Sequence, residues 1–367
     1  TMRLYTKEGS IDLIAFTAVI ILLSIGLVMV FSASSVMGIN DFRDPYHYVK
    51  RQALWAVLGL VIMYVASRVD YHFYKVLALP ALLVAIVLLI LVLFIGENIG
   101  GSKRWIDLGF FNLQPSEIAK LAIVNFTAVY VANKREKIRS FFQGLLPILM
   151  ILGLLFVLIM REPDFGTAMS MSFTVVIVLF AGGVHLGQMF GIGCLAIPAI
   201  YYLIKYEPYR MRRLLAFLDP WADPTGAGWN IIQSLTAIGS GGFFGLGLGN
   251  SRQKFSYLPE HHTDFIFAIL CEELGFIGGA LVLILFFIVA WRGLRIALNA
   301  PDLYGTLLAI GLTSMIGFQA MLNIGVVTGS LPVTGITLPF ISYGGSSLLI
   351  SLASVGVLLN ISRQVRL

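Results

Sequence analysis

The chain has little charge for its length. Of its 367 residues, only 12% are Asp, Glu, Lys or Arg, whereas 58% are hydrophobic. A soluble domain normally carries about 25% charged residues, so this composition excludes an ordinary soluble enzyme. The apolar residues also come in runs of about 20, the length at which a helix crosses a bilayer. The sequence therefore predicts a polytopic membrane protein.

Cysteine is almost absent too. Cys194 and Cys271 both lie in apolar runs, which excludes a disulfide framework. No nucleic-acid-binding motif and no basic tail are evident, so no nucleic-acid partner is expected. The net charge of +6 suits anionic lipid headgroups instead. The first apolar run, 11–33, is too long for a cleavable signal and no clear cleavage site follows it, so we expect it to remain as a span.

The apolar runs predict an all-α fold with ten transmembrane helices. Backbone groups in a bilayer must be satisfied within the segment, so runs of this length form helices. The charge-free stretch from Leu303 to Ser362 is divided at 330–339, where prolines and glycine interrupt helical continuity. We expect one domain over 11–363, with short cytoplasmic tails at 1–10 and 364–367. The predicted spans are 11–33, 52–69, 74–95, 114–133, 144–161, 165–184, 186–204, 264–291, 303–329 and 340–361.

A large loop, about 205–263, separates the seventh and eighth predicted spans. Ten spans place both termini on one side. With the termini inside, the inner segments carry twice as many Lys and Arg residues as the short outer loops, which favours cytoplasmic termini. The long loop is then extracytoplasmic, and its own basic residues go against the usual bias. An anionic ligand at the outer face would account for them.

Two ionisable residues, Glu117 and Lys120, begin the fourth span. Their i,i+3 spacing places them on one helical face, with Glu before Lys in the favourable order. Ionisable groups at membrane depth are costly, and they usually face a partner or a wet cavity. The pair is therefore either a structural ion pair near the interface or part of a substrate cavity that opens to the outer face.

Basic residues gather in two outer segments. Lys103 and Arg104 precede the fourth span, and the long loop carries Arg210, Arg212 and Arg213. Arginine pairs with phosphate oxygens through two parallel hydrogen bonds, so these side chains are candidates to bind a diphosphate. Contact with ordinary lipid headgroups is the alternative for each of them.

Three further features of the outer segments have local explanations as well. The tight turn 161–166 holds three charges, and its Asp164 either caps the next helix or helps to position a ligand. The apolar residues of 231–238 fall at helical spacing, which predicts a short helix in the interface. The glycine-rich run 239–249 lacks the ending of a nucleotide P-loop. We interpret it as close backbone packing or as an approach to a ligand.

Asp264 stands where the chain re-enters the membrane, directly after His262 and Thr263. In the first turn of a helix it would act as an ordinary cap, but the same position would keep its carboxylate ionised, as a general base requires. Adjacent histidines do not by themselves form a tetrahedral zinc site. A divalent ion that joins Asp264 to a diphosphate is a better fit to oxygen ligands.

Six ordered motifs resemble the signatures of the SEDS family, the RodA/FtsW-type peptidoglycan glycosyltransferases. The resemblance covers essentially residues 11–363, and the Phe31-Ser-Ala-Ser-Ser35, Ser251-Arg-Gln-Lys254 and Asn323-Ile-Gly-Val-Val327 segments favour its FtsW/SpoVE branch. The six motifs are Gly100-Gly-Ser-Lys-Arg-Trp105, Gln114-Pro-Ser-Glu-Ile-Ala-Lys120, Glu162-Pro-Asp-Phe-Gly-Thr167, Arg212-Arg-Leu-Leu-Ala-Phe-Leu-Asp-Pro-Trp221, His262-Thr-Asp-Phe-Ile-Phe-Ala268 and Leu338-Pro-Phe-Ile-Ser-Tyr-Gly-Gly-Ser-Ser347.

The resemblance implies an enzyme of the bacterial cytoplasmic membrane that polymerises lipid II at its outer face. It also implies Asp264 as the catalytic residue, Glu117 and Lys120 as the family's Glu/Lys pair, and dependence on Mg²⁺ or Mn²⁺ with no organic cofactor. His262 and Thr263 belong to the same motif and are expected at the substrate. The implied partners are a class B penicillin-binding protein and other divisome or elongasome membrane proteins.

Two other functions stay open at the level of the residues. Ionisable residues inside spans also mark transport pathways, so a lipid II flippase is the main alternative. A division scaffold without activity is the third. Within the enzyme hypothesis, one carboxylate suits direct inversion, whereas a retaining route needs a second carboxylate about 5 Å away, for which Glu117 is the candidate.

Overall fold

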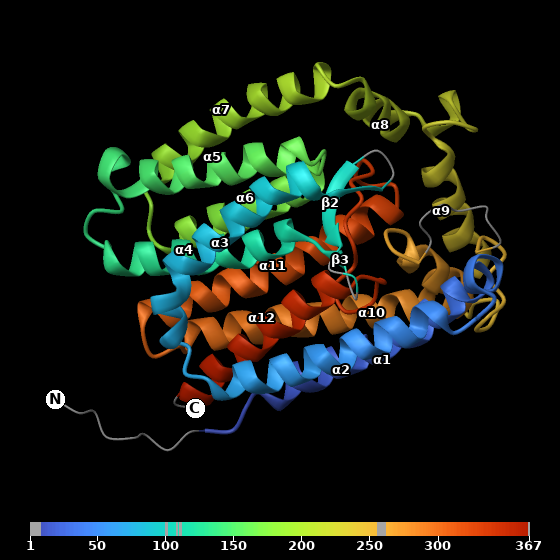
Figure 1. Cartoon of the computed structure of the whole chain (residues 1–367), viewed down its shortest axis with the longest axis horizontal. Helices are drawn as coiled ribbons and strands as arrows, with labels where there is room; N and C mark the ends of the chain where they lie inside the picture. The colour runs from blue at the N-terminus through green and yellow to red at the C-terminus, as the bar shows by residue number, and fades with distance from the viewer. Residues whose placement is uncertain (1–8, 100–101, 108, 110–111, 255–261, 366–367) are drawn as a thin grey trace.

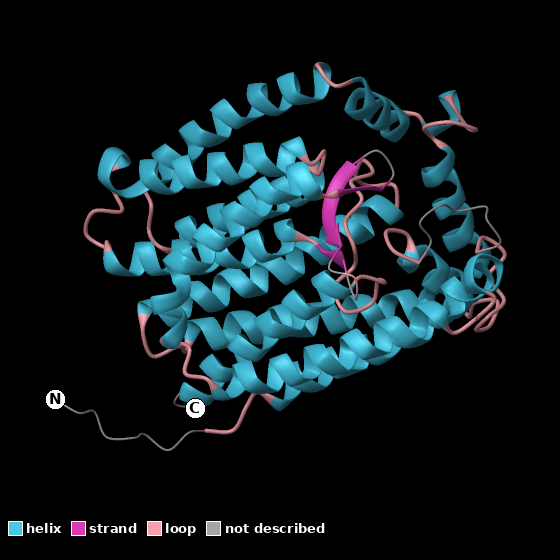
Figure 2. Cartoon of the chain, viewed as in Figure 1, coloured by secondary structure: helices cyan, strands magenta, loops and turns pink. Residues whose placement is uncertain are grey.

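The computed structural model describes residues 9–99, 102–107, 109, 112–254 and 262–365, most of which are helical (Figure 1, Figure 2). Three short strands form an antiparallel sheet in the order β1-β2-β3. The helices are α1 (Leu13–Phe42), α2 (His47–Arg68), α3 (Phe73–Ile95), α4 (Pro115–Asn133), α5 (Leu146–Arg161), α6 (Phe165–Ala181), α7 (Leu186–Lys205), α8 (Pro208–Leu218), α9 (Trp229–Gly241), α10 (Ile266–Leu298), α11 (Leu303–Val327) and α12 (Gly345–Gln364). The strands are β1 (Glu97–Ile99), β2 (Ser102–Asp107) and β3 (Asn112–Leu113). A short π-helix, η1 (Phe141–Leu145), and a short 3₁₀-helix, η2 (Pro220–Ala222), complete the secondary structure.

The helices confirm an all-α polytopic membrane fold. Among the described residues, eight helical segments are long and apolar enough to cross a membrane: α1, α2, α3, η1 with α5, α7, α10, α11 and α12. The fourth predicted span corresponds to α4, and the sixth corresponds to α6, an apolar helix of 17 residues. Each predicted span therefore overlaps a helix, although α1 continues nine residues and α10 seven residues beyond the predicted ends.

Aspartates start three of these helices. The carboxylates of Asp12, Asp164 and Asp302 accept hydrogen bonds from backbone N–H groups of the first turns of α1, α6 and α11, respectively. Each carboxylate satisfies a donor that has no partner within the helix. The capping role predicted for Asp164 is thus confirmed.

Two apolar cores meet at α11. One core joins α1, α2, α9, α10 and α12 to the second half of α11, and the other joins α3, α4, α5 and α6 to its first half. Small residues bring helices close: a Cβ at Gly356 of α12 would collide with α2 at Met63. By contrast, α7 has no buried residue and runs along the edge of the bundle (Figure 1).

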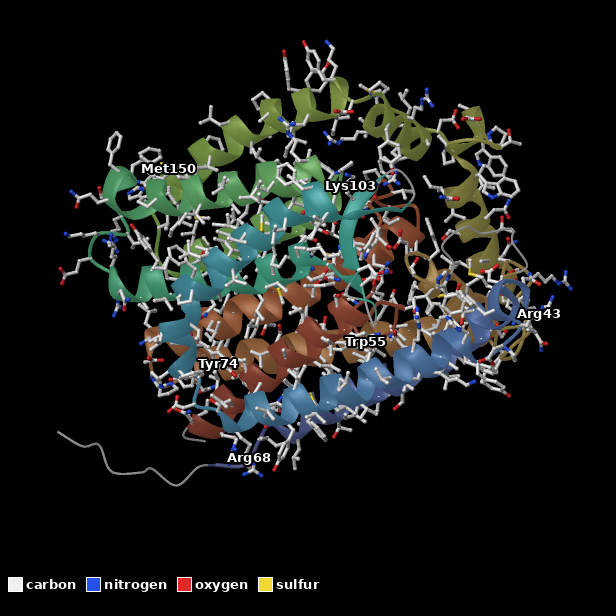
Figure 3. All side chains as sticks on the ribbon, viewed as in Figure 1. Arg43, Trp55, Arg68, Tyr74, Lys103 and Met150 are labelled. Carbon is white, nitrogen blue, oxygen red and sulfur yellow. The ribbon has the colours of Figure 1, made fainter. Side chains whose placement is uncertain are left out.

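Different segments of the chain lie at the two ends of the bundle. The Gly9 N–H donates to the Arg363 carbonyl at 2.9 Å, so the first and last described segments meet at one end. The strands, α9 and the glycine-rich loop lie at the other end (Figure 1). Arg68 and Arg43 mark these two ends on the α1–α2 side, and Lys103 lies on β2 (Figure 3).

The segment 205–263 is more structured than a simple loop. The short helix predicted around 231–238 is present as α9, whereas α8 was not predicted. Outside this segment, the three-stranded sheet before α4 was not predicted either. Residues 255–261 of this segment lie outside the described residues. In its described part, α8 contributes Arg210 and Arg213 to a cavity described below.

Candidate active site

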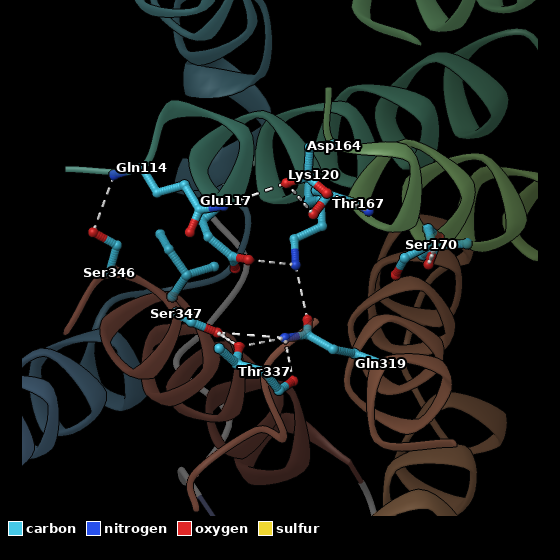
Figure 4. Close-up of polar contacts among 12 residues, drawn as sticks. Gln114, Glu117, Lys120, Asp164, Thr167, Ser170, Gln319, Thr337, Ser346 and Ser347 are labelled. Atoms are coloured by element: carbon cyan, nitrogen blue, oxygen red, sulfur yellow. Dashed lines mark hydrogen bonds and ion pairs between the residues drawn. The ribbon is translucent and has the colours of Figure 1, made fainter. Parts of the chain in front are cut away.

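Lys120 and Glu117 form a buried ion pair on α4. The Lys120 Nζ lies 2.8 Å from the Glu117 Oε1, and the two residues are 2% and 4% exposed. Lys120 also donates to the Gln319 Oε1 of α11 at 2.8 Å (Figure 4). The predicted facing of the pair is confirmed. Two strong acceptors offset the cost of burying the ammonium group.

Gln319 extends this network to the segment before α12. Its Nε2 donates to the Thr337 carbonyl at 3.1 Å, and it lies 3.4 Å from the Ser347 Oγ (Figure 4). The Thr337 hydroxyl in turn donates to Ser347 at 3.1 Å. The Lys120 ammonium is thereby coupled to the segment 334–347. Sequence reasoning missed Gln319, which is one of two amides in a charge-free span.

The backbone around Asp264 is held by three separate groups. The Tyr343 N–H donates to the His262 carbonyl at 3.0 Å, and the Ser342 hydroxyl donates to the Thr263 carbonyl at 2.6 Å. The Asn323 amide donates to the Asp264 carbonyl and to the Ile336 carbonyl, each at 2.7 Å. These contacts fix the residue that leads into α10.

Asp264 is not the cap of α10. The helix begins at Ile266, and its N-cap residue is Phe265. The Asp264 carboxylate lies instead beside Gly335, where its Oδ2 is 3.4 Å from the position that a Cβ would occupy. The Arg104 Nη1 is 4.0 Å from the same position. The carboxylate and the guanidinium therefore lie next to the same face of Gly335. The φ of Gly335, +74°, favours glycine.

The turn 161–164 orients Arg104. Two of its nitrogens donate to backbone carbonyls, Nε to Glu162 at 3.1 Å and Nη2 to Pro163 at 2.6 Å. Its third nitrogen, Nη1, is the one near Gly335. The neighbouring Lys103 is exposed. The structure thus separates two cations that the sequence placed together.

The side chain of Glu162 is fully buried within this turn. Its two carboxylate oxygens have no hydrogen-bond partner among the described residues. Burial raises the pKa of Glu162 to about 9, with a further rise from Asp164 and an opposing effect of Arg104. This carboxyl is therefore neutral at pH 7.

The arginines of α8 point in different directions. The Arg213 Nη1 donates to the Val333 carbonyl at 2.9 Å, and the Arg210 Nη1 donates to the Leu203 carbonyl at 3.0 Å. Both line a small cavity of about 60 Å³ with Phe165 and Leu214. Arg212 is exposed.

Arg213 is electrostatically linked to the Asp264 region. Burial lowers the pKa of Arg213, and the charges of Tyr209, Asp264 and Asp164 oppose that decrease. Arg104 acts in the same direction as burial, as a like charge does. Arg213, Arg104 and Asp264 therefore belong to one electrostatic cluster.

The backbone carbonyls of His262 and Thr263 accept the hydrogen bonds from Tyr343 and Ser342 described above. The His262 ring is 7% exposed and packs against the rings of Tyr48 and Tyr343, with centroids 5.2 and 5.7 Å away.

Among the described residues, no group of three or more His, Cys, Asp or Glu residues is placed to hold a metal. Mg²⁺ often uses one or two carboxylates together with substrate phosphates and water, and Asp264 fits that pattern.

The two parts of the site are about one helical turn apart. Gln319 and Asn323 are i,i+4 neighbours on α11, a separation of about 6 Å along the helix axis. The first contacts Lys120, and the second contacts the Asp264 carbonyl. The arrangement combines a carboxylate, two guanidinium groups and a buried ammonium, which suits acid–base chemistry on an anionic substrate.

Comparison with known proteins gives a consistent result over the whole chain. The family model FTSW_RODA_SPOVE, described as cell cycle protein, matches residues 12–367. Stage V sporulation protein E of Bacillus subtilis (strain 168) is 49% identical over 98% of this chain and 99% of its own. A probable peptidoglycan glycosyltransferase FtsW of Geobacter sp. (strain M18) is 47% identical over 97% of each chain.

Solved structures agree with the sequence relatives. A chain described under the structural coordination of polymerization and crosslinking by a peptidoglycan synthase complex has a TM-score of 0.78 and 31% identity, covering 96% of this chain and 98% of its own. The rod shape determining protein RodA of Thermus thermophilus has a TM-score of 0.71 and 29% identity, covering 96% and 97%.

Proposed function

We propose a mechanism for this chain, which belongs to the FtsW/RodA/SpoVE family and is a peptidoglycan glycosyltransferase. Lipid II is the substrate, and Asp264 is the general base. The observation that carries this assignment is that the Asp264 carboxylate and the Arg104 guanidinium both lie next to Gly335. Three hydrogen bonds, to the backbone carbonyls of His262, Thr263 and Asp264, support that placement.

The reaction transfers the growing glycan from its undecaprenyl diphosphate to the 4-hydroxyl of an incoming lipid II. The hydroxyl oxygen forms a bond to the anomeric carbon, the bond from that carbon to the diphosphate oxygen breaks, and Asp264 accepts the hydroxyl proton. General-base catalysis of this kind contributes about 10²–10⁴ in rate. Arg104 and Arg213 stabilise the negative charge of the departing diphosphate.

Direct inversion is the stereochemical course that we propose. A retaining route needs a second free carboxylate close to the first. Glu117 is the sequence candidate, but its Oε1 is paired with Lys120 at 2.8 Å inside the bundle. We assign Glu117, Lys120 and Gln319 to the shape and charge of the cavity rather than to bond formation.

A divalent cation, Mg²⁺ or Mn²⁺, is part of the proposal. Asp264 would hold it together with the substrate diphosphate, and the ion would neutralise developing charge on the leaving group. The described residues supply one carboxylate at this point, so the substrate would provide the remaining anionic ligands.

The topology that we propose has ten crossings, cytoplasmic termini and an outward-facing site. The adjacency of Gly9 and Arg363 supports an even number of crossings. We also propose a class B penicillin-binding protein as partner, because a chain of a peptidoglycan synthase complex shares the fold over 96% of this chain. Other divisome or elongasome membrane proteins are further proposed partners.

The deciding experiment is polymerisation in detergent, where flipping a lipid across a membrane has no meaning. The purified protein with its penicillin-binding partner is given labelled lipid II, and products are separated by size. We expect glycan polymer from the native chain and a loss of at least about 100-fold in Asp264→Asn, which removes the base. Glu136→Gln, which changes an exposed carboxylate in the connection after α4, is the control for handling and folding.

The alternatives predict different outcomes. A flippase would give no polymer with any partner, while it would still move lipid II in vesicles. A scaffold without activity would let Asp264→Ala restore growth in cells that lack the native chain. Full activity of Asp264→Asn would remove Asp264 from catalysis.

A further inference from the structure

α10 is broken at Gly275, nine residues after its first residue, Ile266. Gly275 has φ 69° and ψ −166°, far from helical values. The glycine-rich loop enters the break: the N–H groups of Phe276 and Ile277 donate to carbonyls of residues 242 and 243, and the N–H groups of residues 246 and 247 donate to the carbonyls of Glu272 and Glu273. The loop therefore replaces hydrogen bonds that an unbroken helix makes within itself.

Glycine is required on both sides of this contact. Gly245 and Gly275 have φ of +80° and +69°. A Cβ at Gly245 would collide with the Glu273 carbonyl, and one at Gly275 would collide with the Gly245 nitrogen. Of the two explanations open for the glycine-rich run, close backbone packing accounts for this part of it.

A buried charge cluster lies beside the break. Glu273 is fully buried and accepts hydrogen bonds from the Ser32 hydroxyl of α1 at 2.7 and 2.6 Å. The Lys254 Nζ, on a residue that is 4% exposed, lies 3.4 Å from the Glu273 Oε1. Glu272 accepts from the Ser251 hydroxyl and from the Arg252 N–H, the latter at 2.9 Å.

This cluster joins two points on either side of Asp264. Ser251 and Lys254 come before it in the chain, whereas Glu272 and Glu273 end the half-helix 266–274 that follows it. The half-helix is buried from Ile266 to Glu273, so it transmits the position of one end to the other as a rigid rod. Polar contacts thus join residues that precede Asp264 to residues that follow it, and a link of this kind restricts the positions open to Asp264.

We propose that Glu273, with Lys254, is a positioning residue that sets the location of the Asp264 carboxylate beside Gly335. The proposal rests on the catalytic role proposed for Asp264. A role in stability alone does not require buried charges, because apolar residues of similar volume are often at least as stabilising. Buried charges that pair at fixed points instead hold the neighbouring chain in one position. A displacement of about 1 Å in a reacting group costs up to about 100-fold in rate.

The chain contains a matched control at the far end of the same helices. Arg292 of α10 and Asp12, the N-cap residue of α1, form an ion pair at 2.6 Å, with side chains 13% and 6% exposed. Like the Ser32–Glu273 contact, it joins α1 to α10, but it lies beyond the break and away from the site. Asp12→Asn therefore reports what is lost when a polar link between these helices is weakened.

The test measures lipid II polymerisation by the complex with its penicillin-binding partner, together with Tm. We expect Glu273→Gln to lower kcat about 10-fold to 100-fold with KM within about twofold, since the carboxylate is displaced while the binding groups remain. Asp12→Asn should lower Tm without changing kcat. Lys254→Arg, which keeps the charge, should retain most of the activity.

A double variant separates positioning from stability. Glu273→Gln with Lys254→Met removes both charges and should recover Tm relative to Glu273→Gln, while kcat stays low. Recovery of kcat together with Tm, or an unchanged kcat in Glu273→Gln, overturns the proposal. If Glu273→Gln fails to fold, Ser251→Ala supplies the same comparison by removing the hydroxyl that donates to Glu272 and accepts from the Lys254 N–H. Full activity of Asp264→Asn would instead overturn the proposed function.

Discussion

At the scale of single residues, Glu162 predicts how stability depends on pH. Its pKa is raised from 4.5 to about 9 by burial, so between these values the folded protein keeps a proton that the unfolded chain releases. Stability therefore falls as pH rises through this window and levels off above it. We expect Glu162→Gln, which cannot ionise, to gain in Tm over the native chain from pH 6 to pH 8.5. The difference in unfolding free energy grows by at most about 1.4 kcal/mol per pH unit.

Thermal unfolding in detergent at several pH values measures this difference. Glu136→Gln removes an exposed carboxylate from the connection after α4 and is the control. Its Tm should follow that of the native chain at every pH. Parallel curves for Glu162→Gln and the native chain would show that Glu162 ionises normally in the folded protein.

Charged residues of the site were accessible to sequence reasoning, whereas its neutral residues were not. Glu117 with Lys120 stood out because ions are costly in a span, and the structure brings them together at 2.8 Å. Asn323 and Ser342 hold the backbone of 263–264, yet an amide or a hydroxyl in an apolar run has many structural explanations. Their partners are distant in sequence, so only the fold identifies them.

At the scale of elements, α8 predicts a difference between its two faces. Arg213 lines the cavity and is electrostatically linked to Asp264, while Arg212 of the same helix is exposed. A charge-assisted contact to phosphate contributes about 1.5–3 kcal/mol, so we expect Arg213→Ala to raise KM for lipid II about 10-fold or more. Arg212→Ala should change KM less than about twofold.

Initial polymerisation rates over a range of lipid II concentrations test this pair. Tm values must be compared alongside, since Arg213 also donates to the Val333 carbonyl. Equal changes in KM for the two variants would mean that α8 acts through its net charge near the membrane rather than through one side of the helix.

Hydropathy predicted the membrane helices well but gave no sign of how they are interrupted. The run 264–291 reads as one span, and Gly275 within it resembles the packing glycines at 278 and 279. Its left-handed φ appears only when the loop 242–247 takes over the helix's hydrogen bonds. Similarly, β2 was overlooked because its six residues pair with partners that are themselves only two or three residues long.

At the scale of the whole molecule, the two ends of the bundle predict opposite sides of the membrane. Asp107 ends β2 at the site end, and Lys137 lies in the connection between α4 and η1 at the other; both are exposed. Of the native cysteines, Cys271 is buried and Cys194 lies on the apolar helix α7, so replacing both by alanine gives a background without thiols. In intact cells, a membrane-impermeant maleimide should label Asp107→Cys and not Lys137→Cys. Lys137→Cys should react only once the cytoplasmic membrane is opened. The reverse pattern would place Asp264 and its arginines on the cytoplasmic side, where a polymerase acting on the outer face could not use them.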